Sequence, residues 1–365
     1  MLSPANILSW LQENVKGMRL SRLKTLAAIV PAAAELCGVG VLALGRAMNT
    51  GTLAKHNIKR VDRFLGNAAV EGLALARAIV NAFAPPSGRV QVLVDWTDVP
   101  NGKLLVFALP CNGRSLPFFV RAVAKDVGEG GLIRAENEGL QALRLIIDKS
   151  REVVIIADRG FGNRRWIGAV RAQGFHFVQR LSCVFNVDTE QYIGALRDLN
   201  LRRGKRIRDW GWGTIGDDEA IEGRLVTAYD PEAKEPWYLV TDLKEIPAPE
   251  VVDFYRRRWW IEPSFRDNKN RDWGLGLAHV HLKDYRRYER LFYIVALAFI
   301  FLSAHGALAE AEGFDKGLKA NTRKTRVLNL LRIGYHLIRK KGEDLRVACV
   351  LLRELTQRNE APNWG

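Results

Sequence analysis

The order of strand-like and helix-like runs between residues 89 and 181 limits the folds that this chain can adopt. Three runs suited to β-strands come first, separated by the turn residues Pro100-Asn101-Gly102 and Cys111-Asn112-Gly113. Consecutive strands predict an antiparallel meander, and the strand–helix–strand alternation that follows predicts parallel strands. The predicted strands cover residues 89–95, 104–109, 116–124, 153–157 and 176–181, and the predicted helices cover about 134–148 and 162–173. The sequence therefore predicts an α/β fold with a mixed sheet of the ribonuclease H-like type.

Helical segments flank this core, and a β-rich segment interrupts it. Residues 1–85 are predicted to be helical and end at a Pro/Gly-rich linker. Short strand-like runs and turn clusters predict a β-rich insertion over residues 184–245, which divides the core into residues 86–183 and 246–310. Residues 311–365 are predicted to form a helical C-terminal region.

Composition narrows the class of protein. The chain has 365 residues and carries 55 Lys and Arg against 40 Asp and Glu, a formal net charge of +15, which favours a polyanionic partner. Its four cysteines lie far apart without a CxxC pair, which argues against a zinc finger or a disulfide scaffold. The apolar runs at 25–45 and 291–302 are interrupted or short compared with the roughly 20 residues of a membrane span, so buried core helices are expected and no membrane partner.

One helix in the N-terminal region has a basic side. The turn residues Thr50-Gly51-Thr52 precede a helical pattern in which Ile58, Val61 and Leu65 share the opposite, apolar side. Such a helix could read DNA, or it could be an ordinary solvated helix, and the pattern leaves both interpretations open. The basic side carries Lys55, Lys59, Arg60 and Arg63.

Two acids, Asp95 and Asp158, each close a predicted apolar strand. In the strand order expected for this fold the two strands are neighbours, so the carboxylates could converge. Converging carboxylates need a counter-charge, most simply Mg²⁺ or Mn²⁺. An Asp after a strand is also a common turn residue, and Asp98 could replace Asp95 if the strand ends elsewhere.

A third acid lies in a helical pattern near residue 260. Tyr255, Arg258, Glu262 and Lys269 are spaced so that an ideal helix places them on one narrow face. That face suits metal binding flanked by phosphate contacts, although Arg258 and Glu262 could also form a plain i,i+4 ion pair. Pro263 removes a backbone donor, which should kink the helix or mark a new turn, and weakens the argument for Lys269.

The pattern Tyr255-x2-Arg258-x3-Glu262-x6-Lys269 resembles the Tyr-Arg-Glu-Lys signature of the DDE transposases of bacterial insertion sequences. This is the branch with a β-strand insertion in the catalytic core. Asp95 in Val-Asp-Trp-Thr-Asp and Asp158 in Ala-Asp-Arg-Gly-Phe look like the family's first and second catalytic acids. The resemblance spans about residues 50–310.

The resemblance implies a cut-and-paste DNA transposase. Asp95, Asp158 and Glu262 would hold two divalent ions, Mg²⁺ or Mn²⁺, about 4 Å apart, for phosphodiester hydrolysis and transesterification. In this branch the freed 3′-hydroxyl attacks the opposite strand and forms a DNA hairpin, which is reopened before strand transfer.

The resemblance also implies DNA contacts and partners. Tyr255, Arg258 and Lys269 match positions that contact phosphates, and Trp237 is similar to a tryptophan that stacks on a flipped base, unless it is a core strand residue. Residues 1–85 would bind the terminal inverted repeats, and a homodimer would form on DNA in the cytoplasm, associated with the bacterial nucleoid. The rival interpretations are a nuclease or resolvase of the same fold and a DNA-binding protein descended from a transposase.

Overall fold

The computed structural model describes residues 2–70, 72–216, 220–231, 233–272, 274–323, 326–340 and 344–358. Within these residues ten strands form one mixed sheet in the order β3-β2-β1-β4-β5-β10-β9-β8-β6-β7. The neighbours β1–β4 and β4–β5 are parallel, and the other pairs are antiparallel. The strands are β1 (Val90–Val99), β2 (Gly102–Cys111), β3 (Arg114–Ala124), β4 (Val153–Ala157), β5 (His176–Arg180), β6 (Asn186–Thr189), β7 (Tyr192–Ala195), β8 (Gly204–Ile215), β9 (Ile221–Tyr229) and β10 (Trp237–Thr241). A mixed sheet with parallel core strands is consistent with a ribonuclease H-like fold, so the predicted fold class is confirmed.

The meander β1-β2-β3 follows from its turn residues. Asn112 and Gly113 both have positive φ, 39° and 80°, as a two-residue hairpin turn requires. The pairing Cys111↔Arg114 closes the hairpin between β2 and β3. Gly113 meets that requirement without steric strain, because it has no Cβ.

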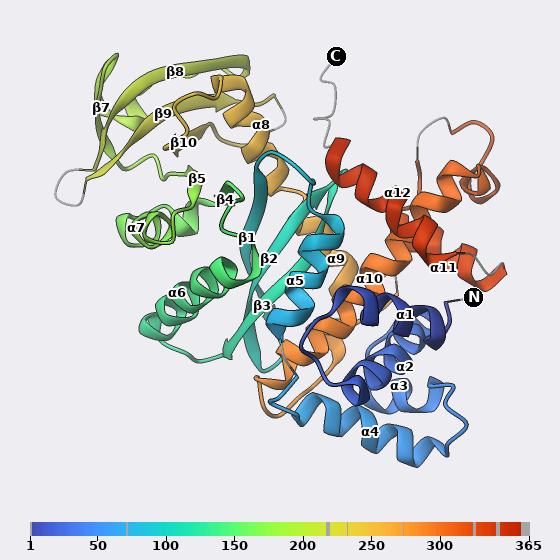
Figure 1. Ribbon diagram of the computed structural model, residues 1–365. Coiled ribbons are helices and arrows are strands. Elements are labelled where there is room, and N and C mark those ends of the chain that lie inside the picture. Colours follow the sequence, from blue (N-terminus) through green and yellow to red (C-terminus); the bar gives the residue numbers. More distant parts are fainter. Residues whose placement is uncertain are drawn as a thin grey trace.

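The predicted β-rich insertion extends the same sheet. Leu239 of β10 pairs with Arg180 of β5, and β9, β8, β6 and β7 continue outward from β10. Figure 1 shows these strands at the far end of the sheet from the N-terminal helices. The insertion therefore lengthens the sheet beside its parallel strands.

The N-terminal and C-terminal helices pack together around one central helix, α10 (Arg287–Ala311). α2, α4, α11 and α12 all contact α10 (Figure 1). The helices of these regions are α1 (Pro4–Asn14), α2 (Leu20–Leu36), α3 (Val41–Ala47), α4 (Ala54–Gly66), α5 (Gly72–Phe83), α11 (Leu330–Lys340) and α12 (Leu345–Arg358). Where the structure describes them, both terminal regions are helical as predicted.

By length and composition, α10 would suit a membrane span, and so would the bent pair of α2 and α3. The apolar stretch of α10 is wholly buried inside the protein. The run at 291–302 is therefore a core helix, as the sequence predicts.

Helices cover both faces of the central strands. Val92 and Val94 of β1 pack on the face that also receives α6 (Glu129–Ile146) and α7 (Arg164–Ala172). Leu93 packs on the opposite face, with α8 (Ala248–Arg258) and α9 (Ile261–Lys269). Because side chains alternate along a strand, Asp95 shares the face of Leu93 and lies toward α8 and α9. Four 3₁₀ turns in the described residues complete the elements: η1 (Arg159–Phe161), η2 (Leu196–Asp198), η3 (Leu277–His279) and η4 (Phe314–Leu318).

Candidate active site

Asp95 lies where β1 parts from β4. The last parallel pair is Val94↔Ala157, while antiparallel pairing of β1 with β2 continues as far as Val99. The prediction that Asp95 ends its strand is therefore wrong, because β2 holds the strand for four further residues. The pairing of β1 with β4, however, does end beside Asp95, which leaves space on the β4 side of Asp95 for a second acid.

Asp158 occupies that space. It directly follows Ala157 at the end of β4, and its Oδ1 accepts a hydrogen bond of 2.7 Å from the backbone N–H of Gly160. This bond caps η1 and fixes the carboxylate next to β1. The predicted neighbourhood of the two acid-bearing strands is confirmed by the sheet order.

The helix that carries the third acid is broken. α8 and α9 are separated at Trp259 and Trp260, in agreement with the prediction that Pro263 kinks the helix or marks a new turn, although the break falls before Glu262 and not after it. Over this break the backbone bonds shorten to three-residue spacing, with Glu262 N–H donating to Trp259 C=O at 3.3 Å. Pro263 has no N–H for that carbonyl, and its ring would clash with it, so the break falls four residues before the proline.

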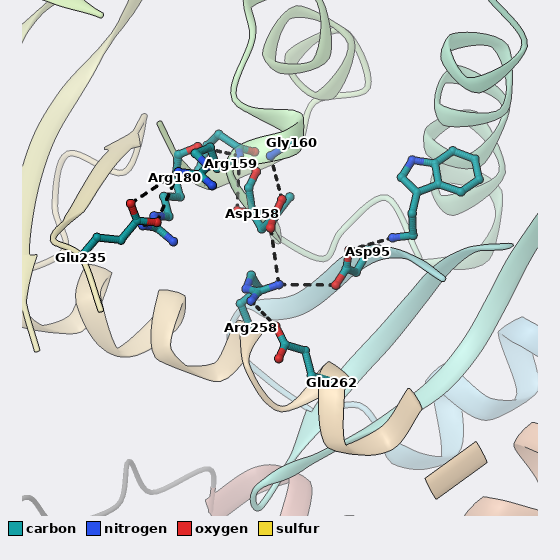
Figure 2. A network of polar contacts seen from close by, with 11 residues as sticks. Asp95, Asp158, Arg159, Gly160, Arg180, Glu235, Arg258 and Glu262 are labelled. Carbon is teal, nitrogen blue, oxygen red and sulfur yellow. Dashed lines mark hydrogen bonds and ion pairs between the residues drawn. The ribbon is translucent and has the colours of Figure 1, made fainter. Parts of the chain in front are cut away.

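Arg258, the last residue of α8, lies among the three acids (Figure 2). Its Nη1 is 3.4 Å from Asp95 Oδ2 and 3.8 Å from Asp158 Oδ2. Its Nη2 is 2.5 Å from Glu262 Oε1. The Arg258 side chain is 5% exposed, against 20% for Asp95, 39% for Asp158 and 46% for Glu262. The structure thus brings together four of the predicted site residues. The i,i+4 ion pair of Arg258 and Glu262, which the sequence offered as an alternative, is one of the three ion pairs in this cluster.

The cluster changes the acidity of its members. Burial raises the pKa of Asp95 from its ordinary 3.8 to about 6; Arg258 opposes this rise, and the neighbouring Asp158 and Glu262 charges add to it. Burial acts to lower the pKa of Arg258, but Tyr255 and the three acids outweigh it, so that this pKa lies above its ordinary value. Three carboxylates against one guanidinium leave an excess of negative charge at this point of the sheet.

The donor set fits a divalent ion. Carboxylate oxygens on a rigid sheet and an adjoining helix are ligands that Mg²⁺ and Mn²⁺ prefer, and the excess negative charge calls for a cation. Among the described residues, no group of three or more His, Cys, Asp or Glu side chains is already arranged around a common metal position. The guanidinium of Arg258 is the cation that the three acids share instead.

Tyr255 and Trp237 lie in the core beneath this cluster. Tyr255 is fully buried on α8, and burial raises the pKa of its hydroxyl. Trp237 opens β10, is 4% exposed, and meets Tyr255 edge-on with 5.1 Å between ring centroids. Both side chains pack against the apolar residues under α8, which is the core placement that the sequence left open for Trp237. Base stacking by Trp237 stays a prediction.

Lys269 ends α9 on the same side of the sheet as the acids. Burial lowers the pKa of its ammonium group, and the negative charges of Asp98 and Asp95 act in the opposite direction. Lys269 is therefore within electrostatic reach of Asp95 despite the helix break. Asp98 itself is exposed on β1, and it is not among the three carboxylates that form ion pairs with Arg258 in the described residues.

The predicted basic helix is α4, far from the acids along the chain. Its buried side consists of Asn57, Val61, Phe64 and Leu65. Ile58, placed on the apolar side by the sequence, is only half-buried. Of the predicted cations, Lys55, Lys59 and Arg63 are exposed, and Arg60 is half-buried with its Nε donating to Thr25 Oγ1 at 3.1 Å.

A second group of charged residues beside Asp158 was missed by the sequence analysis. Glu235 Oε1 lies 2.7 Å from Arg180 Nη2 and 3.3 Å from Arg159 Nη1 (Figure 2). The side-chain amide of Gln179 donates to the backbone carbonyl of Asp158. A usable signal was present, because Arg180 ends the third parallel strand just as Asp158 follows the second.

Comparison with known families agrees with this arrangement. Residues 132–301 match the family model described as transposase DDE domain. The match includes Asp158, Arg258 and Glu262, and it begins after Asp95. None of the curated proteins matches the chain. Residues 132–301 thus match a transposase DDE domain, and the matched family consists of enzymes that cleave DNA and transfer its strands, generally with divalent metals. The sequence prediction is confirmed to that extent, and the insertion-sequence branch stays a prediction.

Proposed function

We propose that this protein is a DNA transposase that moves an insertion sequence by cut-and-paste, and that Asp95, Asp158 and Glu262 are its catalytic acids. The observation that carries the proposal is their convergence. Acids from β1, from the end of β4 and from α9 all lie within 4 Å of one guanidinium. Three separate parts of the chain supply them, and carboxylates that converge in this way suit a site that holds metal for phosphoryl chemistry.

The three acids are proposed to hold two Mg²⁺ or Mn²⁺ ions. When bound, such ions activate the attacking oxygen and stabilise the leaving oxygen of an in-line displacement at phosphorus. The sheet holds Asp95 and the η1 cap holds Asp158, so these two acids are positioned before DNA arrives. Glu262 is the most exposed acid of the three and lies at the start of α9, where it can adjust to a ligand.

The proposed chemistry has four displacements at phosphorus. Water attacks a phosphodiester at the transposon end, and the 3′-oxygen leaves with a proton as a hydroxyl. This 3′-hydroxyl then attacks a phosphodiester of the opposite strand to give a hairpin, and the flanking DNA leaves with a 3′-hydroxyl. A second water reopens the hairpin and restores the 3′-hydroxyl of the transposon end. That hydroxyl finally attacks a phosphodiester of target DNA, whose own 3′-oxygen leaves as a hydroxyl. Arg258 and Lys269 are proposed to bind the phosphates, with Tyr255 supporting Arg258 from the core and Trp237 stacking a base if DNA binding uncovers it.

Residues 1–85 are proposed to bind the terminal inverted repeats through α4. Two features support a DNA-reading role: a close helix–helix crossing and a fixed turn. A Cβ on Gly45 of α3 would lie 2.5 Å from Ile58 Cα, so the two helices cross with little space between them. The buried Asn57 accepts hydrogen bonds of 2.8 Å from Thr50 Oγ1 and Thr52 Oγ1, which orders the turn before α4. The exposed cations of α4 are then presented together to DNA.

The active form is proposed to be a homodimer on DNA, because cut-and-paste movement needs two transposon ends in one complex. Residues 311–365 are the proposed region of dimer and DNA contacts, and α12 exposes Val347 and Val350 there. We place the complex in the cytoplasm, on nucleoid DNA. Light scattering of the purified protein, with and without transposon-end DNA, measures the oligomeric state. A protein that stays monomeric under both conditions would contradict the proposed dimer.

The test uses a donor plasmid that carries the coding sequence with its native flanking DNA, a target plasmid, and Mg²⁺. The expected products are excised donor, hairpin ends and joined target. Asp158→Asn should abolish all of them while leaving binding to the flanking DNA intact. Asp98→Asn is the matched control, because it removes an exposed carboxylate from the same strand and should remain active.

The alternatives give different products. Nicks without joined target would favour a nuclease or resolvase of the same fold. Unchanged DNA activities in Asp158→Ala would favour a protein that only binds DNA. Excision without hairpins would keep the transposase and remove the hairpin intermediate.

A further inference from the structure

The position of Arg258 has a consequence for metal binding. Its guanidinium contacts all three proposed metal ligands, through Nη1 to Asp95 and Asp158 and through Nη2 to Glu262. With a side chain that is 5% exposed, Arg258 is held inside the cluster and is not a solvated surface charge. A cation that contacts the same oxygens at the same place would meet both steric and electrostatic competition from this group.

The surroundings of Arg258 also offer it a second position. It is the last residue of α8, directly before the break at Trp259 and Trp260. Its guanidinium carbon lies 4.6 Å from the ring centroid of Trp259, and Trp259 is 41% exposed. A side-chain rotation along this aromatic face would carry the guanidinium from the acids toward solvent while keeping a cation–π contact.

We propose that Arg258 is a displaceable counter-cation: it holds the three acids together in the metal-free protein and must leave them before divalent ions bind. This inference rests on the proposed function, since it assumes that the acids are metal ligands. A DNA phosphate at the site would give the released guanidinium a new anionic partner. Metal and DNA would then each favour the binding of the other by the same factor, because the coupling is reciprocal.

The test measures Mn²⁺ binding to the full-length metal-free protein, without DNA, from the loss of the free aqueous Mn²⁺ signal in electron paramagnetic resonance. Arg258→Gln removes the competitor. Arg257→Gln is the matched control, because Arg257 is the preceding residue of α8 and its Nη1 donates to Gln91, at 2.8 Å, rather than to the acids. We expect Arg258→Gln to bind Mn²⁺ about tenfold more tightly than the wild type, or more, which is the effect of one close charge pair. Arg257→Gln should bind as the wild type does.

The outcomes separate this inference from the proposed function. If the wild type binds Mn²⁺ and Arg258→Gln binds it equally or more weakly, Arg258 positions the ligands and the displacement is refuted, while the metal site stands. If neither protein binds Mn²⁺ at millimolar concentration, the metal site and the displacement both fail. An equal gain in both arginine variants would assign the effect to net charge and refute the displacement.

A second measurement uses the folded wild type and does not depend on the stability of a variant. In protein labelled with ¹⁵N-arginine, the Nε–H signal of Arg258 is the one absent from Arg258→Lys. Addition of Mg²⁺ should move or broaden this signal as the guanidinium leaves the acids, while the Arg257 signal stays in place. An Arg258 signal unchanged at saturating Mg²⁺ would refute the displacement.

Discussion

Asp95→Asn should make the metal-free protein more stable, although it removes a proposed catalytic acid. Asp95 is largely buried, and its pKa is raised from 3.8 to about 6, chiefly by burial. Its ionised form is therefore held in the folded state at a cost, even with Arg258 nearby. Asparagine keeps the shape, and its Oδ1 can still accept the 2.8 Å bond from the Trp96 backbone N–H.

The size of the effect follows from the pKa of Asp95. At 1.36 kcal/mol for each pKa unit, a rise from 3.8 to about 6 corresponds to about 3 kcal/mol at neutral pH. Because the folded protein holds this proton more tightly than the unfolded chain, wild-type stability falls as pH rises between about 4 and 6. Asp95→Asn should lack this fall, so its advantage is absent below about pH 4 and full above about pH 6. With an unfolding entropy of about 2.1 cal/mol/K per residue, 365 residues give a rise of about 4 °C in Tm.

The assay is thermal unfolding followed by circular dichroism in EDTA, at several pH values on both sides of this window. Asp98→Asn is the control, since Asp98 is exposed on the same strand and its substitution should change Tm little. The reasoning is refuted if Asp95→Asn melts below the wild type at neutral pH, or if the difference between them does not depend on pH. In the first case Arg258 would stabilise the ionised Asp95 more than burial disfavours it, and in the second case the two effects would cancel.

Other contacts predict outcomes of their own. Gly334→Ala should destabilise the protein by about 2 kcal/mol or more in thermal unfolding, because its Cβ would lie 1.8 Å from the carbonyl oxygen of Leu302, where α11 crosses α10. A normal Tm would show that the two helices can separate. Lys59→Gln should weaken binding to duplexes of any sequence and reduce the slope of log affinity against log salt by about 1, measured by fluorescence anisotropy. A loss confined to one sequence would instead indicate a base contact. Mn²⁺ binding should weaken as pH falls below about 6, because protons compete for Asp95 in calorimetric titrations; a pH-independent affinity would contradict that.

Short-range patterns predicted most of the core of this fold. Strand β4 was placed correctly at residues 153–157, and the Asn112-Gly113 hairpin followed from residues that accept positive φ. Strand length was less predictable, because it depends on the partner. β1 continues past Asp95 because β2, which follows after only two residues, supplies partners as far as Gly102, and the residue types of β1 alone do not show how far this pairing extends.

The same limit applies to the insertion. Its β-rich character was predicted from short strand-like runs and turn clusters, but the continuation of the central sheet depends on β10 pairing with β5, which no local pattern specifies. The burial of Trp237 follows from this pairing, because β10 carries it under α8 against Tyr255. An aromatic residue in a short strand has the same local pattern in a core and at a stacking site, so only the tertiary pairing could separate the two.

The acid cluster depends on the helix break as much as on the acids. On a single straight helix, Arg258 and Glu262 would form an ordinary surface pair, with the arginine exposed. Pro263 cannot donate to Trp259, so the chain turns there, and α9 starts a new direction with Glu262 in its first turn. The end of α8 is thereby left against the sheet, where the Arg258 guanidinium reaches both Asp95 and Asp158. Pro263, which weakened the sequence argument, is thus the residue that lets one guanidinium contact three acids, because it sets the direction of the helix that carries the third.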